Sequence, residues 1–133
     1  MTAICETKMT SLLLKRKVLI VDDESSIREV LRRYFTKKGF DVLLASSGKE
    51  ALEAFSENQP HIVLLDILMP GCDGLETLKE LKKMLPSVKV IMISAVKNEE
   101  VFHKCLKLGA LDYIVKPFEL LDLHARVFGK LLC

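Results

Sequence analysis

No apolar stretch in this 133-residue chain approaches the roughly 20 residues that a transmembrane helix needs. The apolar run 12–14 is also too short for the core of a signal peptide. These two absences predict a cytoplasmic protein that makes no use of a membrane. We expect residues 1–15 to form a flexible N-terminal tail and residues 16–133 to form one domain of ordinary size.

Residues typical of zinc or disulfide frameworks are scarce and poorly spaced. The four cysteines have no C-x-x-C spacing and are typical of reduced cytosolic thiols. The three histidines are not spaced as a metal site, and we interpret them as structural or surface residues. An excess of charge of one sign is also missing, since the net charge is only +2. We therefore expect no nucleic-acid binding by this chain alone.

What the sequence does have is an alternation, repeated five times, of short apolar runs and amphipathic segments. This alternation is typical of an α/β fold with a parallel sheet. The expected strands are 17–21, 40–45, 61–66, 88–94 and 111–116. The expected helices run from Ser25 or Ser26 to before Gly39, over 49–57, 75–84 and 99–108, and from 119 to the chain end. A serine is expected to cap the first helix, and Asp73 the third.

Polar side chains follow four of these strands at the point where each strand ends. The first strand ends in Asp22 and Asp23, the third in Asp66, the fourth in Ser94 and the fifth in Lys116. The carboxyl ends of parallel strands lie at one edge of an open sheet, and ligands bind there. Three carboxylates at that edge suit a hard cation such as Mg²⁺. A hydroxyl and an ammonium beside them suit an anionic phosphoryl group.

The order and spacing of these motifs resemble the receiver domain of two-component response regulators over nearly the whole chain. The resemblance implies a doubly wound, flavodoxin-like α/β fold, in which five helices cover a five-stranded parallel sheet of order 2-1-3-4-5. It also implies a phospho-accepting signalling switch, not an enzyme with a separate substrate. The phosphoryl group would come from a phosphohistidine on a sensor histidine kinase or a histidine phosphotransfer protein. The resulting conformational change would control partner binding or an output domain outside this sequence.

By this resemblance, Asp66 is the phosphoacceptor, and it binds Mg²⁺ together with Asp22, Asp23 and the backbone carbonyl of Leu68. Main-chain ligation leaves the side chain at position 68 free to vary. Lys116 would contact a phosphoryl oxygen.

The switch residues implied by the resemblance are Ser94, which would move toward the phosphoryl group, and Tyr113, which would follow inward. The bond between Lys116 and Pro117 would be cis, because proline permits this isomer far more readily than other residues.

Other interpretations of a strand-end aspartate fit the sequence less well. A phosphatase of the haloacid dehalogenase type needs a second acid two residues after its nucleophile, and that position holds Leu68. A flavodoxin-like electron carrier would bind a phosphate after the first strand, where Asp22 and Asp23 would repel it. A degenerate receiver used only for protein contacts would not need all the signature residues. The sequence leaves open whether this is a free-standing receiver or a piece of a larger regulator.

Two features are distinctive for a chain of this type. Leu68 and Val96 are apolar at positions that, in the family, flank the water that removes the phosphoryl group, which predicts slow spontaneous dephosphorylation. The fourth helix, fifth strand and fifth helix resemble a face used for homodimers or downstream proteins. Phe102 stands where a basic partner for Asp122 would be expected, which favours apolar docking over an ionic dimer network.

Overall fold

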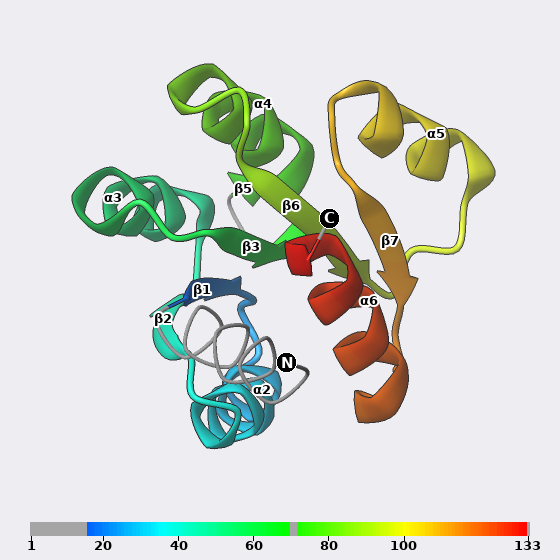
Figure 1. Cartoon of the computed structure of the whole chain (residues 1–133). Coiled ribbons are helices and arrows are strands. Elements are labelled where there is room, and N and C mark those ends of the chain that lie inside the picture. The colour runs from blue at the N-terminus through cyan, green and yellow to red at the C-terminus, as the bar shows by residue number, and fades with distance from the viewer. Residues whose placement is uncertain (1–15, 70–71, 133) are drawn as a thin grey trace.

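The computed structural model of this chain describes residues 16–69 and 72–132 (Figure 1). The predicted tail therefore lies outside the described residues. The strands of the main sheet are β1 (Lys17–Val21), β2 (Asp41–Ala45), β3 (Ile62–Leu65), β6 (Lys89–Ser94) and β7 (Asp112–Val115). A small hairpin pairs β4 (Leu68–Met69) with β5 (Cys72–Asp73). The helices of the described part are α2 (Ser25–Lys37), α3 (Gly48–Asn58), α4 (Gly74–Met84), α5 (Glu99–Lys107) and α6 (Leu120–Leu132).

The main sheet is parallel throughout, and its strand order is β2-β1-β3-β6-β7. This is the predicted order 2-1-3-4-5, with the small hairpin inserted after the third strand. The direction of winding reverses between β1 and β3, which pair from Val18 with Ile62 to Val21 with Leu65. Ligand sites of such sheets form beyond the carboxyl ends of the strands on either side of this reversal.

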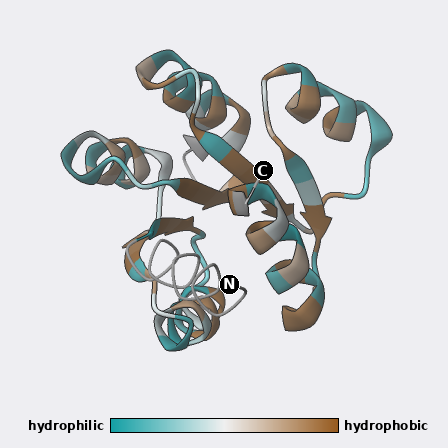
Figure 2. Ribbon diagram, in the orientation of Figure 1, coloured by the Kyte–Doolittle hydropathy of each residue, from teal (hydrophilic) through white to brown (hydrophobic). Residues whose placement is uncertain are grey.

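Helices cover both faces of the sheet, as Figure 1 shows, and separate its core into two parts. Leu19 and Val21 of β1 pack in the cluster that includes residues of α3, α4 and α5. Val18 and Ile20 point to the opposite face, where they pack with residues of α2 and α6. The strands are apolar on both faces for this reason (Figure 2), since side chains alternate between two buried surfaces. None of the helices in the described ranges is both long and apolar enough to span a membrane.

The helix ends confirm one predicted cap and contradict the other. Asp73 caps α4, where its carboxylate accepts a hydrogen bond of 2.9 Å from the backbone N–H of Leu75. The prediction of a serine cap for α2 was wrong, because the helix begins at Ser25 and the N-cap residue is Glu24, with no side-chain cap. The carboxylate of Asp22 instead accepts a 2.9 Å hydrogen bond from the N–H of Glu24. The side chain of Asp22 therefore shapes the turn through which the chain enters α2.

Candidate functional site

Three carboxylates converge beyond the ends of β1 and β3. Asp22, Asp23 and Asp66 each offer an oxygen, and these oxygens all lie within 4.8 Å of one another. Asp22 and Asp66 are buried and Asp23 is exposed, so the cluster opens to solvent on one side. The strand pairing causes this convergence, because the N–H of Asp66 donates to the carbonyl of Val21 at 3.0 Å.

Lys116 reaches this cluster from the end of β7. Its ammonium lies 2.6 Å from Oδ2 of Asp22, 3.1 Å from Oδ2 of Asp66 and 3.5 Å from a carboxylate oxygen of Glu24. The peptide bond between Lys116 and Pro117 is cis. Burial alone would lower the pKa of Lys116, but its hydrogen bonds to Asp22 and Asp66 raise that pKa above its ordinary value. Lys116 is therefore a cation at neutral pH.

Burial changes the pKa of Asp66 in the opposite direction from that of Lys116. It favours the neutral form of both groups, and the neutral form of a carboxyl group is the protonated one. Burial raises the pKa of Asp66 above its ordinary value, and the nearby charge of Asp22 adds to this effect. The hydrogen bond and charge of Lys116 oppose it only in part. One carboxylate oxygen of Asp66 also accepts a 3.3 Å hydrogen bond from the N–H of Leu68. Asp66 is thus a carboxylate with a raised proton affinity.

The donor set fits Mg²⁺. This ion prefers oxygen ligands at 2.0–2.1 Å, so that opposite ligands lie about 4.2 Å apart. The 4.8 Å span of the three carboxylate oxygens is close to this size. Asp22, Asp23 and Asp66 could therefore hold the ion with small side-chain movements, and the exposed side of Asp23 leaves room for water ligands.

Gly74 is a site residue whose role the sequence did not reveal. Gly74 is the first residue of α4. A Cβ atom on Gly74 would lie 2.6 Å from Cα of Ile67, and closer still to the carbonyl oxygen of Asp66. Its N–H donates to the carbonyl of Ile67 at 2.9 Å. Glycine therefore lets the start of α4 approach the backbone beside Asp66.

Arg28 is a second residue that the sequence did not single out. It lies in the first turn of α2, and its guanidinium donates from Nη1 to the backbone carbonyl of Asp22 at 2.7 Å. A basic residue in an amphipathic helix gives no sign of such a contact, because the sequence does not say where the side chain points.

Ser94 and Tyr113 meet beside Val96, next to the end of β6. Ser94 is fully buried, and its hydroxyl accepts a 3.3 Å hydrogen bond from the N–H of Val96. The hydroxyl of Tyr113 donates to the carbonyl of Val96 at 2.6 Å. Burial raises the pKa of Tyr113, so this hydroxyl stays protonated at neutral pH. The ring of Tyr113 is buried and meets the ring of Phe102 edge-on, with centroids 5.8 Å apart.

Comparison with known proteins assigns the family. Residues 18–128 match the model of the response regulator receiver domain. This chain belongs to that family. The receiver domain is 42% identical to the probable transcriptional regulator ycf27 of Porphyridium aerugineum over 113 residues, which are 85% of this chain and 47% of the relative. The receiver domain thus spans about half the length of that relative.

Solved receiver structures share its fold. CheY of Borrelia burgdorferi, in a complex with CheX, BeF3 and Mg²⁺, is 35% identical and superimposes with a TM-score of 0.84, covering 87% of this chain and 89% of the other. The receiver domain of NtrX from Brucella abortus is also 35% identical, with a TM-score of 0.81 and coverage of 86% and 97%. The chain is a receiver domain of two-component signalling, as its strand-end motifs predict.

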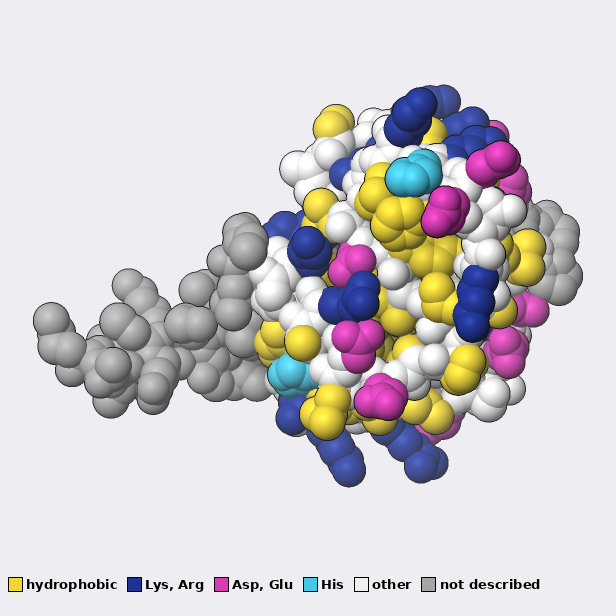
Figure 3. All heavy atoms as spheres, turned by 90° about the vertical axis from the view of Figure 1, so that its right-hand side faces the viewer, with side chains coloured by type: hydrophobic (Ala, Val, Ile, Leu, Met, Phe, Trp, Pro, Cys, Tyr) yellow, Lys and Arg dark blue, Asp and Glu magenta, His cyan; other side chains and the backbone are white. Residues whose placement is uncertain are grey.

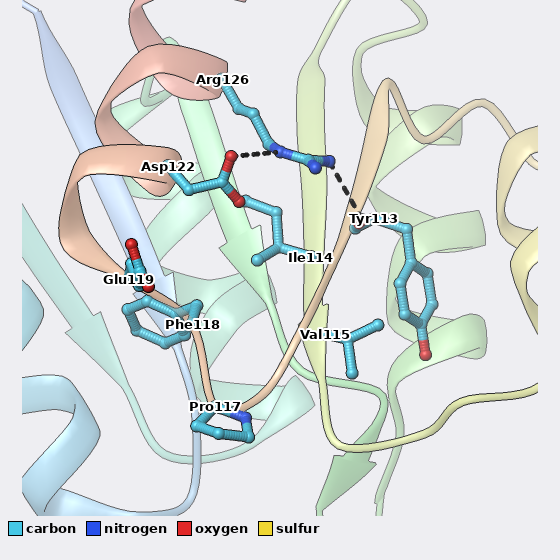
Figure 4. A pocket seen from close by; sticks show the side chains of 8 residues that line it. All are labelled: Tyr113, Ile114, Val115, Pro117, Phe118, Glu119, Asp122 and Arg126. Atoms are coloured by element: carbon cyan, nitrogen blue, oxygen red, sulfur yellow. Dashed lines mark hydrogen bonds and ion pairs between the residues drawn. The ribbon is translucent and has the colours of Figure 1, made fainter.

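The receiver domain has a hollowed surface along β7 and the start of α6. A groove of about 540 Å³ is lined by residues of this region (Figure 4): Tyr113, Ile114, Val115, Pro117, Phe118, Glu119, Asp122 and Arg126. Arg126 forms ion pairs with Asp112 at 3.0 Å and with Asp122 at 3.2 Å. Figure 3 shows an apolar area on this side of the molecule, with acidic and basic side chains around it.

A smaller pocket of about 260 Å³ adjoins α5 and includes Phe102, Tyr113 and Val96. Phe102 is 37% exposed on α5. The acidic side chain of Asp122 has a partner within its own helix, Arg126.

Proposed function

We propose that Asp66 accepts the phosphoryl group and that Lys116 and Ser94 stabilise it. The observation that carries this proposal is the position of the Lys116 ammonium, 3.1 Å from Asp66. A carboxylate oxygen of Asp66 attacks phosphorus, the bond from phosphorus to the donor nitrogen breaks, and the imidazole of the donor leaves with a proton from solvent. The product is an aspartyl phosphate. Lys116, which lies beside Asp66, would donate to the new phosphoryl oxygens.

Mg²⁺ is the cofactor that we propose, held by Asp22, Asp23, Asp66 and the backbone carbonyl of Leu68. When bound, it would neutralise charge on the phosphoryl oxygens, which is the main requirement of phosphoryl transfer. The size and chemistry of the carboxylate cluster support this. So does the presence of Mg²⁺ with BeF3, a phosphoryl analogue, in the complex of the Borrelia relative.

The donor that we propose is a phosphohistidine on a sensor kinase or a histidine phosphotransfer protein in the cytoplasm. The chain acts only on its own aspartate and is not an enzyme with a separate substrate. Ser94 and Tyr113 form the switch. Both contact Val96, so a shift of the serine hydroxyl toward a modified Asp66 would alter the loop to which Tyr113 is bonded.

The direct test is the intact mass of the chain after incubation with Mg²⁺ and acetyl phosphate. The wild type should gain one phosphoryl group, and EDTA should abolish the gain. Asp66→Asn should gain none, whereas Asp73→Asn, which removes a carboxylate at a helix cap, should still be modified. If the folded, Mg²⁺-bound wild type gains nothing from acetyl phosphate or from a phosphorylated histidine phosphotransfer protein, the proposal fails.

We also propose that the aspartyl phosphate is long-lived. The side chain of Leu68 is 62% exposed beside the site, and neither Leu68 nor Val96 carries a side-chain polar group that could orient an attacking water. The mass shift followed over time in buffer measures this lifetime. Decay within seconds would show that another group orients the water.

Partner binding through α5, β7 and α6 is the proposed output. The exposed ring of Phe102 lies against the buried ring of Tyr113, so a change in Tyr113 would reach the surface there. Phe102→Ala should weaken binding of a second copy or of a downstream protein to the phosphorylated form. Leu44→Ala is a control of similar exposure on the edge strand β2. Equal binding by all three proteins would exclude docking through Phe102.

A further inference from the structure

The acidic cluster is held in shape by contacts to the backbone of Asp22 as well as to its side chain. The N–H of Asp22 donates to the carbonyl of Ala45 at 3.1 Å, just beyond the last paired residue of β1. Its carboxylate accepts bonds from the N–H of Glu24 and from Lys116. Its carbonyl accepts the 2.7 Å bond from Arg28. The strand ladder has ended at this point, so Arg28 supplies a donor that the sheet no longer provides.

Arg28 and Lys116 bind different oxygens of the acidic cluster, and only Arg28 leaves the carboxylate oxygens free to bind a metal ion. Lys116 binds oxygens of Asp22 and Asp66 that a metal ion could use. Arg28 binds a main-chain oxygen of Asp22, so its contact can persist when the carboxylates turn to a metal ion.

We infer that Arg28 is a positioning residue for Mg²⁺ binding and phosphoryl transfer. It ties the first turn of α2 to the end of β1 and fixes the short segment that carries Asp22 and Asp23. This inference rests on the proposed function of Asp66, and it assigns the role to the hydrogen bond and not to the charge. The two roles predict opposite changes in Mg²⁺ affinity. Removal of a positive charge near a cation site should strengthen Mg²⁺ binding, whereas loss of the positioning hydrogen bond should weaken it.

The test uses the full chain with Arg28→Met, which loses both the bond and the charge, and Arg28→Lys, which keeps the charge and one donor. Arg33→Met is the matched control. Arg33 lies on the same helix, is exposed and pairs only with Glu29 among the contacts of the described residues. Isothermal titration calorimetry gives the Mg²⁺ dissociation constant. The initial rate of phosphoryl gain from acetyl phosphate is measured across Mg²⁺ concentrations.

Loss of one hydrogen bond from a charged donor should raise the Mg²⁺ dissociation constant of Arg28→Met roughly tenfold. Arg28→Lys should stay within about threefold of wild type, and Arg33→Met should not differ from it. The maximal rate at saturating Mg²⁺ should be recovered in Arg28→Met, because the residue positions the metal ligands and does not touch the phosphoryl group. Arg28→Gln, with a shorter neutral side chain, replaces Arg28→Met if the latter is unfolded in melting experiments.

Unchanged or tighter Mg²⁺ binding in Arg28→Met would overturn the inference, as would a rate that saturating Mg²⁺ does not restore. A failure of the proposed function looks different. In that case the wild type itself would bind no Mg²⁺ or gain no phosphoryl group.

Discussion

Replacement of Lys116 by methionine tests the electrostatics of the site without any phosphoryl donor. The side chain of Lys116 is 11% exposed, and those of its partners Asp22 and Asp66 are 4% and 6% exposed. Lys116→Met keeps most of the side-chain volume but leaves two buried carboxylates without their shared cation. Removal of one partner from a buried ion pair costs about 3–5 kcal/mol. We expect about 3 kcal/mol at pH 7.5 in EDTA, at the lower end because Asp23 opens the cluster to water.

The loss should depend on pH in a defined direction. The contacts of Lys116 hold the pKa of Asp66 down against burial, so the variant raises that pKa further above its ordinary value. A carboxyl group whose folded-state pKa is raised contributes stability below its unfolded pKa, and this contribution is lost as pH rises through the folded pKa. The deficit of Lys116→Met should therefore be smaller at pH 5 than at pH 7.5.

Urea denaturation followed by circular dichroism at both pH values measures the free energy of unfolding. Lys79→Met is the matched control, because Lys79 forms an exposed pair with Glu76 at 3.3 Å, and such pairs contribute at most about 1 kcal/mol. A loss in Lys116→Met no larger than that of Lys79→Met, or one that grows as pH falls, would refute this account of the site.

Three further predictions concern stability and lifetime. Asp66→Asn should be more stable than wild type at pH 7.5 in EDTA, because burial raises the pKa of Asp66 and so disfavours its charged form. In urea denaturation this gain in stability should shrink as pH falls through that pKa. Gly74→Ala should lower the free energy of unfolding by about 1–3 kcal/mol, because its Cβ would collide with backbone at Asp66 and Ile67. Gly129→Ala on α6 is the control, because a Cβ there meets nothing within 4 Å, and it should raise the free energy of unfolding by about 0.5–1 kcal/mol in the same assay. Leu68→Asn should shorten the lifetime of the aspartyl phosphate severalfold as followed by intact mass, with Leu121→Asn, another exposed leucine, unchanged; equal lifetimes in both variants would exclude a role for position 68.

The strands could be predicted from the sequence because the same property, apolarity on both faces, both identifies and stabilises them. The strand ends then located Asp66 and Lys116, since their places follow from strand direction alone. Strand order was available only through the resemblance, because periodicity allows other doubly wound orders. The hairpin of β4 and β5 was missed, since two-residue strands are too short to show any period.

The residues that the sequence did not reveal act through contacts across a strand-to-helix connection, between residues six to eight positions apart. Gly74 is required because the backbone of residues 66 and 67 passes close to the start of α4, whereas a single glycine between a strand and a helix is compatible with many local conformations. The serine cap was wrongly predicted because the carboxylate of Asp22 takes the N–H of Glu24. The preference of serine for the N-cap position therefore did not decide where α2 begins, because a turn formed by Asp22 places Glu24 at that position.

The charges of the site indicate an order of events. Four carboxylates lie at or beside the site, those of Asp22, Asp23, Asp66 and Glu24, and Lys116 pairs with all of them except Asp23. In the proposed reaction the carboxylate of Asp66, which carries one negative charge, becomes an acyl phosphate that carries nearly two at neutral pH, so the site gains about one negative charge. Lys116 already pairs with three of the carboxylates, so we expect that it does not offset this increase alone. We therefore expect Mg²⁺ to occupy the site before the chemical step, and the dependence of the rate on Mg²⁺ should reflect this occupancy.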